Sequence, residues 1–382
     1  MKKLFVLALM VGLVGVVSLS SQAVGSPHRV IITLESEVND NAIAALESNG
    51  GKIVKRLPLV NGLVVMLPNE AAVPTFNALA GVKKVEADAK VFALGKPSSA
   101  VQPTETLEWG ANRIDADLAW ATSKGTGVKV AIIDTGIDKD HPDLVANLKG
   151  GTNFVAPGLK AADPNKWNDD NGHGTHVAGI VAAVDNSIGV IGVAPEASLY
   201  AVKVLDKTGS GYVSDVIDGI YWAIQNGMQV INMSLGSASD VQALHDAVDA
   251  AYNSGILVVA AAGNSGDGNP NTNEVIYPAK YSSVIAVAAT ASDDSIPTWS
   301  SSGAEVELAA PGVSIRSTWN DNMYKTISGT SMATPHVAGV VALKLSSGIL
   351  ASDIRVNLQA TAQDLGIAGF DYSYGYGLVK AY

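Results

Sequence analysis

The sequence predicts an α/β protein in three layers, a parallel β-sheet between two layers of helices, preceded by a small α+β module of ferredoxin-like order. Two observations carry this prediction. From Gly127 onward, near-continuous apolar strands alternate with segments of helical periodicity, which is typical of a parallel sheet covered on both faces. Residues 28–91 follow a different order, β-α-β-β-α-β, which favours a compact module of its own.

Composition limits what such a protein can be. The chain has 382 residues, of which 47% are hydrophobic and 16% charged, so it can bury the core of one large domain and a small one. It contains no Cys, which excludes disulfides and thiolate metal sites. The formal net charge of −11 at pH 7 disfavours nucleic acid or an anionic membrane as a partner.

The first segment has the pattern of a secretory signal peptide. Two lysines precede an apolar run over residues 4–17, and small residues follow up to Ala23. An uncleaved membrane anchor is the alternative, but the run is short compared with the ~20 residues of a membrane span. We therefore expect residues 1–23 to be removed on export, with cleavage near Ala23, and the protein to be secreted.

The small module is predicted to contain four strands and two helices. The strands are expected at residues 28–35, 52–57, 62–67 and 82–91, and the helices at 39–48 and 69–79. Asn69 is the expected N-cap of the second helix. A stretch rich in Gly, Pro and Ser follows from Gly95, as in an exposed linker. We therefore divide the exported chain into residues 24–94 and a larger domain, residues 95–382.

The larger domain is predicted to alternate strands and helices. Strands are expected at residues 128–133, 198–205, 230–233, 256–261 and 284–289. Helices are expected at residues 175–184, 213–225, 241–252 and 332–345. In such a fold, ligand-binding and catalytic groups belong at the carboxyl ends of the strands.

Two short motifs lie at such positions. The motif AIIDTG ends a buried strand with Asp134, and a lone Asp there is usually structural or a metal ligand. The motif NGHGTHVAG puts His173 at the start of an apolar helix, between two glycines that we expect to leave the imidazole accessible. His176 follows within the same turn, but the helical zinc pattern His-Glu-x-x-His is absent.

A third motif, GTSMATPHVAG, puts Ser331 at the start of another helix. Unpaired backbone N–H groups and the helix dipole favour a developing negative charge at such a terminus. A simple N-cap is the more common role of a Ser at a helix start. Pro335 is expected in the first turn, where its missing N–H would cost little.

Together the three motifs are far more specific than each alone. An Asp, a His and a Ser can form a nucleophile, its general base and the group that orients the base. Their order along the chain and the intact motifs AIIDTGID, NGHGTHVAG and GTSMATPHVAG resemble those of the subtilase family of serine proteases. The resemblance spans nearly the whole chain. It implies a precursor with a signal peptide, an inhibitor-type propeptide and a subtilisin-like catalytic domain.

The resemblance implies a secreted serine endopeptidase that hydrolyses peptide bonds through an acyl-enzyme. Asp134 would orient His173, and His173 would take the proton of Ser331 as that residue attacks the scissile carbonyl. Asn264, in the motif AAAGN, matches the side chain that donates to the oxyanion. Two further histidines fall at positions that are structural in the family, His176 and His336.

The resemblance also implies a groove for an extended substrate. Two stretches of mostly small residues match its walls, Gly209-Ser210-Gly211 and Ser234-Leu235-Gly236. One wall of the pocket for the side chain before the cleaved bond is matched by Ala261, Ala262 and Gly263. Ile276 departs from the pattern, because many relatives have a small residue at that floor position. We therefore expect a shallower apolar pocket that favours medium-sized apolar side chains.

A calcium site is implied by the same resemblance. The matching ligands are the side chains of Glu105, Asp143 and Asn186 and the carbonyl oxygens of Val184, Ile188 and Val190. Glu105 stands where relatives have Gln, and all-oxygen ligation suits Ca²⁺. A plain surface loop with an acidic turn is the alternative. The pair Asp169-Asp170 is a weaker candidate for a second cation site.

The resemblance gives the small module a role as propeptide, an intramolecular chaperone and inhibitor whose last strand lies in the active site. The sequence Val91-Phe92-Ala93-Leu94 suits apolar subsites. We therefore expect self-cleavage between Leu94 and Gly95, followed by trimming of residues 95–104.

Two other functions remain open. A catalytically inactive relative could bind peptides, although the intact triad and Asn264 argue against it. A nucleotide-binding enzyme on a similar sheet would need G-x-G-x-x-G after the first strand, where this chain has DTGID. The expected partners are protein and peptide substrates and the chain's own propeptide. We expect a monomer that binds neither nucleic acid nor a membrane.

Overall fold

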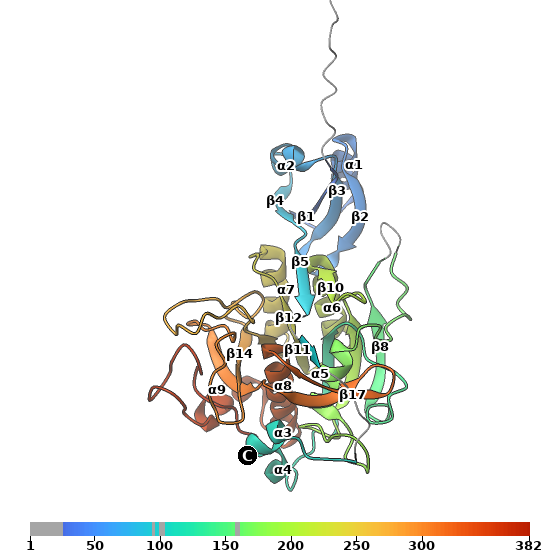
Figure 1. Cartoon of the computed structure of the whole chain (residues 1–382). Helices are drawn as coiled ribbons and strands as arrows, with labels where there is room; N and C mark the ends of the chain where they lie inside the picture. The colour runs from blue at the N-terminus through green and yellow to red at the C-terminus, as the bar shows by residue number, and fades with distance from the viewer. Residues whose placement is uncertain (1–25, 94–95, 99–103, 157–160) are drawn as a thin grey trace, which may run out of the picture.

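The computed structural model describes residues 26–93, 96–98, 104–156 and 161–382. Two predicted features lie outside these ranges, the signal peptide at residues 1–23 and the cleavage pair Leu94–Gly95. The described residues form a small N-terminal unit that sits on a larger one (Figure 1). Within these ranges, no helix is long and apolar enough to cross a membrane.

The N-terminal unit has the predicted β-α-β-β-α-β order. Its elements are β1 (His28–Leu34), α1 (Asp40–Ser48), β2 (Lys52–Leu57), β3 (Gly62–Leu67), α2 (Val73–Asn77) and β4 (Val82–Ala87). The strands form one antiparallel sheet in the order β2-β3-β1-β4. Leu46 of α1 and Phe76 of α2 are buried against this sheet together with Ile32 and Val65.

Two predictions for this unit are wrong in detail. The second helix begins as a 3₁₀ turn, η2 (Glu70–Ala72), and the side chain of Asn69 does not cap it. The strand expected at residues 82–91 is two strands, because β4 ends at Ala87 and β5 (Lys90–Ala93) joins a different sheet. The break falls at Asp88, whose side chain bonds to Ser214 of the larger unit.

The larger unit contains the predicted parallel sheet. Its seven strands lie in the order β15-β14-β13-β11-β7-β9-β8, and every neighbouring pair is parallel. Their bounds are β7 (Lys129–Asp134), β8 (Leu148–Asn153), β9 (Ser198–Lys203), β11 (Val230–Met233), β13 (Leu257–Ala261), β14 (Val284–Thr290) and β15 (Val306–Pro311).

Helices cover both faces of this sheet, as predicted for three layers. On one face lie α5 (His173–Ala182), α8 (Thr330–Ser346) and α9 (Ala351–Thr361). On the other lie α6 (Val213–Gln225) and α7 (Gln242–Asn253). Each layer has its own buried apolar cluster, and alternate residues of one strand enter opposite clusters, such as Ile132 and Ile133 of β7.

Several elements of the larger unit were not predicted. They include β8, β15 and α9, the short helices α3 (Trp109–Arg113) and α4 (Ala116–Ala119), and a small sheet of β6 (Lys96–Ser98), β16 (Ile315–Trp319) and β17 (Met323–Ser328). Their apolar signal is weak. The sequence of β8, LKGGTN, holds one large apolar residue, and α9 fully buries only Ile354 and Leu358.

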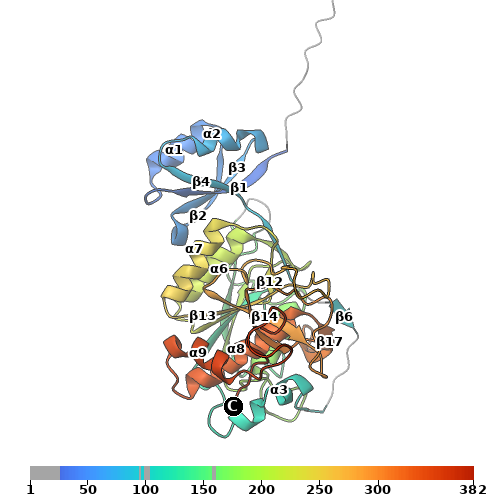
Figure 2. The same ribbon diagram turned by 90° about the vertical axis from the view of Figure 1, so that its left-hand side faces the viewer.

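The N-terminal unit packs on α6 and α7 (Figure 2). Its carboxylates lie at the amino ends of both helices. Asp88 accepts bonds from Ser214 N and Ser214 Oγ in the first turn of α6, and Glu86 accepts one from Gln242 N at the start of α7. Negative charge at these positions satisfies unpaired N–H groups and complements the helix dipoles.

An ion-pair group adds to this contact. Lys55 of β2 donates to Asp215 at 2.7 Å and to Asp218 at 2.5 Å, both on α6. Burial raises the pKa of Asp218 to about 6, and the attraction of Lys55 offsets that rise only in part. The contact therefore combines helix capping with a partly buried charge cluster.

Candidate active site

The three motifs meet at the carboxyl edge of the sheet, as predicted. Asp134 is the last residue of β7, His173 the first of α5, and Ser331 lies in the first turn of α8. Asn264 follows the end of β13 at the same edge. Parallel strands converge there, so residues distant in sequence reach one site.

Asp134 and His173 form the central hydrogen bond of the site. His173 Nδ1 lies 2.8 Å from Asp134 Oδ1 and 3.0 Å from Oδ2, and both side chains are buried. Because a carboxylate only accepts, Nδ1 carries the proton and donates it. Burial lowers the pKa of His173, but the charge and hydrogen bond of Asp134 outweigh it and hold that pKa above its ordinary value.

The two glycines beside His173 have a packing role, not the expected one of access. His173 is only 4% exposed. A Cβ atom at Gly172 would lie 2.2 Å from Trp319 Cε2, and one at Gly174 would lie 2.2 Å from the carbonyl oxygen of Gly136. Gly172 therefore lets the start of α5 pack on Trp319 of β16, and Gly174 lets it approach the loop that follows Asp134.

Asp169 fixes the segment that leads into α5. Its Oδ1 accepts bonds from Asn171 N and Gly172 N, and its Oδ2 accepts bonds from Thr175 N and Thr175 Oγ1. The neighbouring Asp170 pairs with Lys203 at 2.7 Å. Protein groups thus occupy both carboxylates, and the structure does not support the second cation site considered for this pair.

Ser331 is bound to the segment after β11. Its Oγ donates to the carbonyl oxygen of Ser234 at 2.9 Å, and Ser234 Oγ donates to the carbonyl oxygen of Ser331 at 2.8 Å. His173 Nε2 is buried and has no hydrogen-bond partner among the described residues. The Asp–His bond is therefore formed here and the Ser–His bond is not, which is common before a substrate tightens such contacts.

Asn264 is oriented by the residue before Ser331. Its Oδ1 accepts bonds from Thr330 N at 3.0 Å and Thr330 Oγ1 at 2.9 Å. With Oδ1 engaged in this way, Nδ2 is the part of the amide that can donate to a substrate oxygen. The two partners also tie the end of β13 to the start of α8.

The other two histidines of the motifs are buried and neutral. Burial lowers the pKa of His176 to about 3 and that of His336 to about 4. His176 Nε2 donates to the carbonyl oxygens of Ile315 and Lys325, and His336 Nδ1 donates to that of Met332. These contacts agree with the structural role expected for both side chains.

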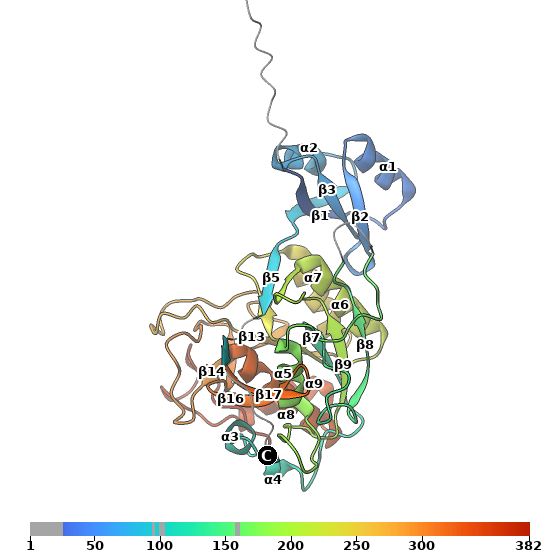
Figure 3. The ribbon, with the colours of Figure 1, turned by 45° about the vertical axis from the view of Figure 1, so that its right-hand side comes forward.

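The predicted groove stretches lie on either side of β5. The strands β10 (Ser210–Tyr212) and β12 (Leu235–Gly236) form an antiparallel sheet in the order β10-β5-β12. Phe92 is opposite both Ser210 and Gly236. The remaining pairs include Val91 with Gly211 and Ala93 with Leu235, and Ala93 N donates to the carbonyl oxygen of Gly209. Figure 3 shows β5 leading from the N-terminal unit into the larger one.

The predicted pocket residues are also neighbours. Ile276 N donates to the carbonyl oxygen of Ala262, a buried residue that directly follows Ala261 at the end of β13. A Cβ atom at Gly236 would lie 2.5 Å from Ile276 Cδ1, and one at Gly263 would lie 3.4 Å from Ile276 Cγ1. The side chain of Ile276 therefore lies between the two glycine segments.

The predicted calcium ligands gather in one region as well. Asp143 is fully buried and accepts bonds from Asn186 Nδ2 at 2.6 Å, Val190 N at 3.0 Å and Tyr324 OH at 3.1 Å. Glu105 Oε1 accepts a bond from Asn186 N at 2.5 Å. Two further ligand residues bond within this group, since Val184 N donates to the carbonyl oxygen of Asp143 and Ile188 N to Asn186 Oδ1. Among the described residues, no three His, Cys, Asp or Glu side chains cluster as metal ligands.

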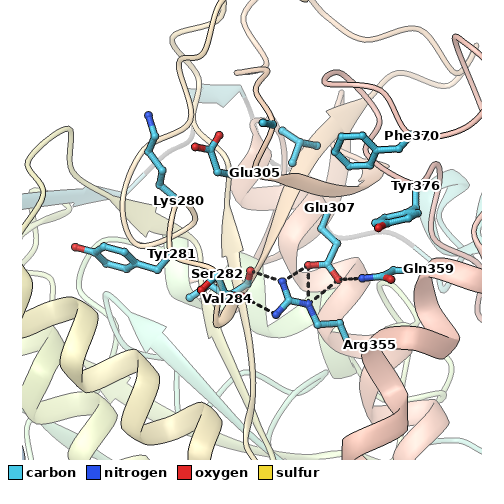
Figure 4. A pocket seen from close by; sticks show the side chains of 12 residues that line it. Lys280, Tyr281, Ser282, Val284, Glu305, Glu307, Arg355, Gln359, Phe370 and Tyr376 are labelled. Carbon is cyan, nitrogen blue, oxygen red and sulfur yellow. Dashed lines mark hydrogen bonds and ion pairs between the residues drawn. The ribbon is translucent and has the colours of Figure 1, made fainter.

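A cavity of about 390 Å³ lies at the other edge of the sheet, beside the amino ends of β14 and β15 (Figure 4). Its floor holds Glu307, which is 4% exposed and accepts bonds from Arg355 and Gln359. Aromatic rings of Phe370 and Tyr376 line one side. The cavity lies away from the triad residues.

Three residues of the site were not predicted from the sequence: Asp169, Lys203 and Thr330. Lys203 ends the otherwise uncharged strand SLYAVK, and a charge at a buried strand end was a signal that could have found it. Asp169 was considered only as a cation ligand. Thr330 gave no signal, because its contact with Asn264 depends on the tertiary fold.

Comparison with known proteins identifies the family. Residues 125–377 match the subtilase family. The chain is 45% identical to subtilisin E of Bacillus subtilis over 338 residues, which cover 88% of this chain and 83% of that protein. It is 52% identical to subtilisin DY of Bacillus licheniformis over 280 residues, 72% of this chain and 97% of that protein.

A third relative is the thermostable alkaline protease of Halalkalibacterium halodurans, 47% identical over 303 residues that cover 78% of this chain and 79% of that protein. The match over most of the chain agrees with the parallel sheet and with the site at its carboxyl edge. The chain therefore belongs to the subtilase family and is a subtilisin-like serine endopeptidase.

Proposed function

We propose that the chain hydrolyses peptide bonds through a triad of Asp134, His173 and Ser331. The observation that carries this proposal is the buried bond from His173 Nδ1 to Asp134, because it leaves the lone pair on Nε2. Nε2 takes the proton of the Ser331 hydroxyl as Oγ bonds to the scissile carbonyl carbon. The imidazolium then gives that proton to the leaving amine as the C–N bond breaks and the acyl-enzyme forms.

The oxyanion of the tetrahedral intermediate is held by two donors in this proposal. They are Asn264 Nδ2, oriented by Thr330, and the backbone N–H of Ser331 in the first turn of α8. The same two donors hold the oxyanion again in deacylation, in which water takes the place of the amine and His173 again acts as the base. The loss of one such donor typically costs ~10²–10³ in turnover.

We further propose that substrates bind as an extended strand between β10 and β12, in the place that β5 takes in the structure. The segments Gly209-Ser210-Gly211 and Ser234-Leu235-Gly236 supply the backbone partners. Ala261, Ala262, Gly263 and Ile276 form the pocket for the side chain before the cleaved bond.

The N-terminal unit acts in this proposal as an inhibitor and folding aid that is removed by self-cleavage. Support comes from the strands on either side of the expected cut. β5 ends at Ala93 in the groove, and β6 begins at Lys96 beside β17, the strand that leads toward Ser331. A peptide bond between residues 94 and 95 joins these two strands. We propose that residues 1–23 direct secretion and that the processed enzyme, residues 95–382 before trimming, works as a monomer.

A Ca²⁺ ion is proposed at Glu105, Asp143 and Asn186 with the carbonyl oxygens of Val184, Ile188 and Val190. The residues fit this ion because Asp143 is a fully buried carboxylate whose hydrogen-bond partners are all neutral. Burial raises the pKa of Asp143, and its hydrogen bonds offset this only in part. A hard cation with oxygen ligands would stabilise the ionised form and tie the loop to the segment around Glu105.

The substitution Ser331→Ala tests the proposed nucleophile and self-cleavage together. We expect at least a ~10³-fold loss of casein hydrolysis. The N-terminal unit should stay attached, whereas N-terminal sequencing of the wild-type protein should find the cut after Leu94. Near-wild-type hydrolysis by the variant would contradict the triad, and a cut of the variant at the same bond would contradict self-processing.

The acid limb of activity tests the His173–Asp134 bond. His173 must be neutral to act as a base, so kcat/KM falls when the pH drops through its pKa. Because Asp134 raises that pKa, we expect the midpoint above the ordinary histidine value of ~6.5. Asp134→Asn should move the His173 titration, followed by NMR, to lower pH and reduce kcat by ~10⁴. An unchanged titration would show that Asp134 is not the partner.

The pocket is tested by Ile276→Gly. Removing this side chain deepens the floor of the pocket. We therefore expect substrates with a large aromatic residue before the cleaved bond to gain at least ~10-fold in kcat/KM relative to substrates with Leu or Val. Contacts in an apolar pocket typically discriminate between side chains by ~1–3 kcal/mol. A peptide library processed by both enzymes measures this. A wild-type profile already dominated by Phe and Tyr would refute the narrowed pocket.

Calcium removal is tested by thermal unfolding. EDTA should lower the melting temperature of the wild-type enzyme, and added Ca²⁺ should restore it, because an ion that binds only the folded state stabilises it. Asp143→Asn is expected to melt at the same temperature with and without EDTA. A wild-type melting temperature that EDTA leaves unchanged would remove the proposed site.

A further inference from the structure

Lys203 is a buried lysine that the triad mechanism does not use. It is the last residue of β9 and is 4% exposed. In the parallel pair of β7 and β9 it lies opposite Asp134. A buried ammonium group is stable only when acceptors replace its hydration shell, so its surroundings show what it holds in place.

Each of the three N–H bonds of Lys203 finds an acceptor. Nζ lies 2.5 Å from the carbonyl oxygen of Thr135, 2.9 Å from that of Leu205 and 2.7 Å from Asp170 Oδ1. These three bonds use the full donor capacity of an ammonium group. The acceptors come from three separate segments, so one side chain joins them.

The segments of Thr135 and Asp170 flank the Asp–His pair. Thr135 N donates to Asp134 Oδ1 at 2.7 Å, and Thr135 Oγ1 accepts a bond from Gly174 N, next to His173. Asp170 lies on the other side of His173, in the turn where Asn171 Oδ1 accepts a bond from His173 N. Lys203 thus bonds to Thr135, the residue after Asp134, and to Asp170, three residues before His173.

The remaining segment, around Leu205, leads to the groove. Val204 N and Leu205 N both donate to the carbonyl oxygen of Asp134. Leu205 also forms a bridge with Gly211 of β10, one of the strands that flank β5. The Lys203 bond to the Leu205 carbonyl therefore links the groove wall to the catalytic carboxylate.

We propose that Lys203 is a positioning residue, which sets the geometry of the Asp134–His173 pair and of groove strand β10 by joining Thr135, Asp170 and Leu205. The inference rests on the proposed function, since it takes Asp134 and His173 as the catalytic pair. Its role is indirect, because Lys203 contacts neither the imidazole nor the carboxylate in any hydrogen bond of the described residues. A shift of ~1 Å at a reacting group can cost ~10²-fold in rate.

The test compares Lys203→Met with Lys344→Met, each made as the full chain. Lys344 is a matched control, because it is also buried, at 6% exposed, and lies in the last turn of α8. Among the described residues, its Nζ has a single hydrogen-bond partner, Thr361 Oγ1. Three quantities are measured on each folded enzyme. They are kcat and KM on a peptide substrate, the melting temperature, and the far-downfield proton resonance of the His173 Nδ1–H bond.

We expect Lys203→Met to lower kcat by ~10²-fold with a smaller rise in KM, and to weaken or abolish the downfield resonance. Lys344→Met should leave kcat and the resonance unchanged, because Lys344 makes one long bond in the last turn of α8. A merely structural role of Lys203 would make the two variants alike. A folded Lys203→Met enzyme with kcat within about threefold of wild type and an intact resonance would overturn the proposal.

A second variant covers the case in which Lys203→Met does not fold. Asp170→Ala removes only the charged acceptor of Lys203, and the fold should survive because the Asp170 side chain is 56% exposed. We expect kcat to drop several-fold and the His173 Nδ1–H resonance to broaden. If both stay unchanged, the inference is overturned. Activity retained by Ser331→Ala would instead contradict the proposed function itself, so the two failures remain distinct.

Discussion

The structure of the site depends on one buried hydrogen bond, from His173 Nδ1 to the carboxylate of Asp134. A carboxylate out of water is stable only with donors around it, and here they are the imidazole and Thr135 N. The parallel sheet makes this arrangement possible, because it brings the end of β7 and the start of α5 to one edge. Gly174, beside His173, then allows the start of α5 to lie close to Asp134 and Gly136, as the bond requires.

The N-terminal unit contacts the larger unit through the kind of backbone pairing that we propose for a substrate, and it adds contacts of its own. β5 adds to β10 and β12 through backbone pairing, which any extended peptide could provide. Asp88 and Glu86 at the helix starts, and Lys55 between two aspartates of α6, are contacts that only this unit makes. These added contacts explain how a strand as short as β5 can stay bound between β10 and β12. They also explain why Asp88 interrupts the strand expected at residues 82–91.

Sequence patterns predicted the fold where the apolar signal is continuous. The ranges of α6 and β11 agree with the predicted ones at both ends, and the motifs predicted Asp134, His173, Ser331 and Asn264 at the carboxyl edge. Prediction failed where tertiary contacts decide. The glycines of β8 pair only because β9 lies beside it. Asp169 and Lys203 are polar residues whose partners come from distant segments, so no local pattern identifies what they hold.

In the positioning role that we propose, Lys203 orders the segment around the Asp134 carboxylate without neutralising its charge. A lysine bonded directly to Asp134 would compete with His173 for the carboxylate and weaken the attraction that raises the histidine pKa. Lys203 instead bonds to the carbonyl oxygen of the next residue, Thr135, and its charged partner is Asp170. The Asp134 oxygens are thereby left to His173 and to Thr135 N. The backbone around the carboxylate is held in place while its charge stays directed at the imidazole.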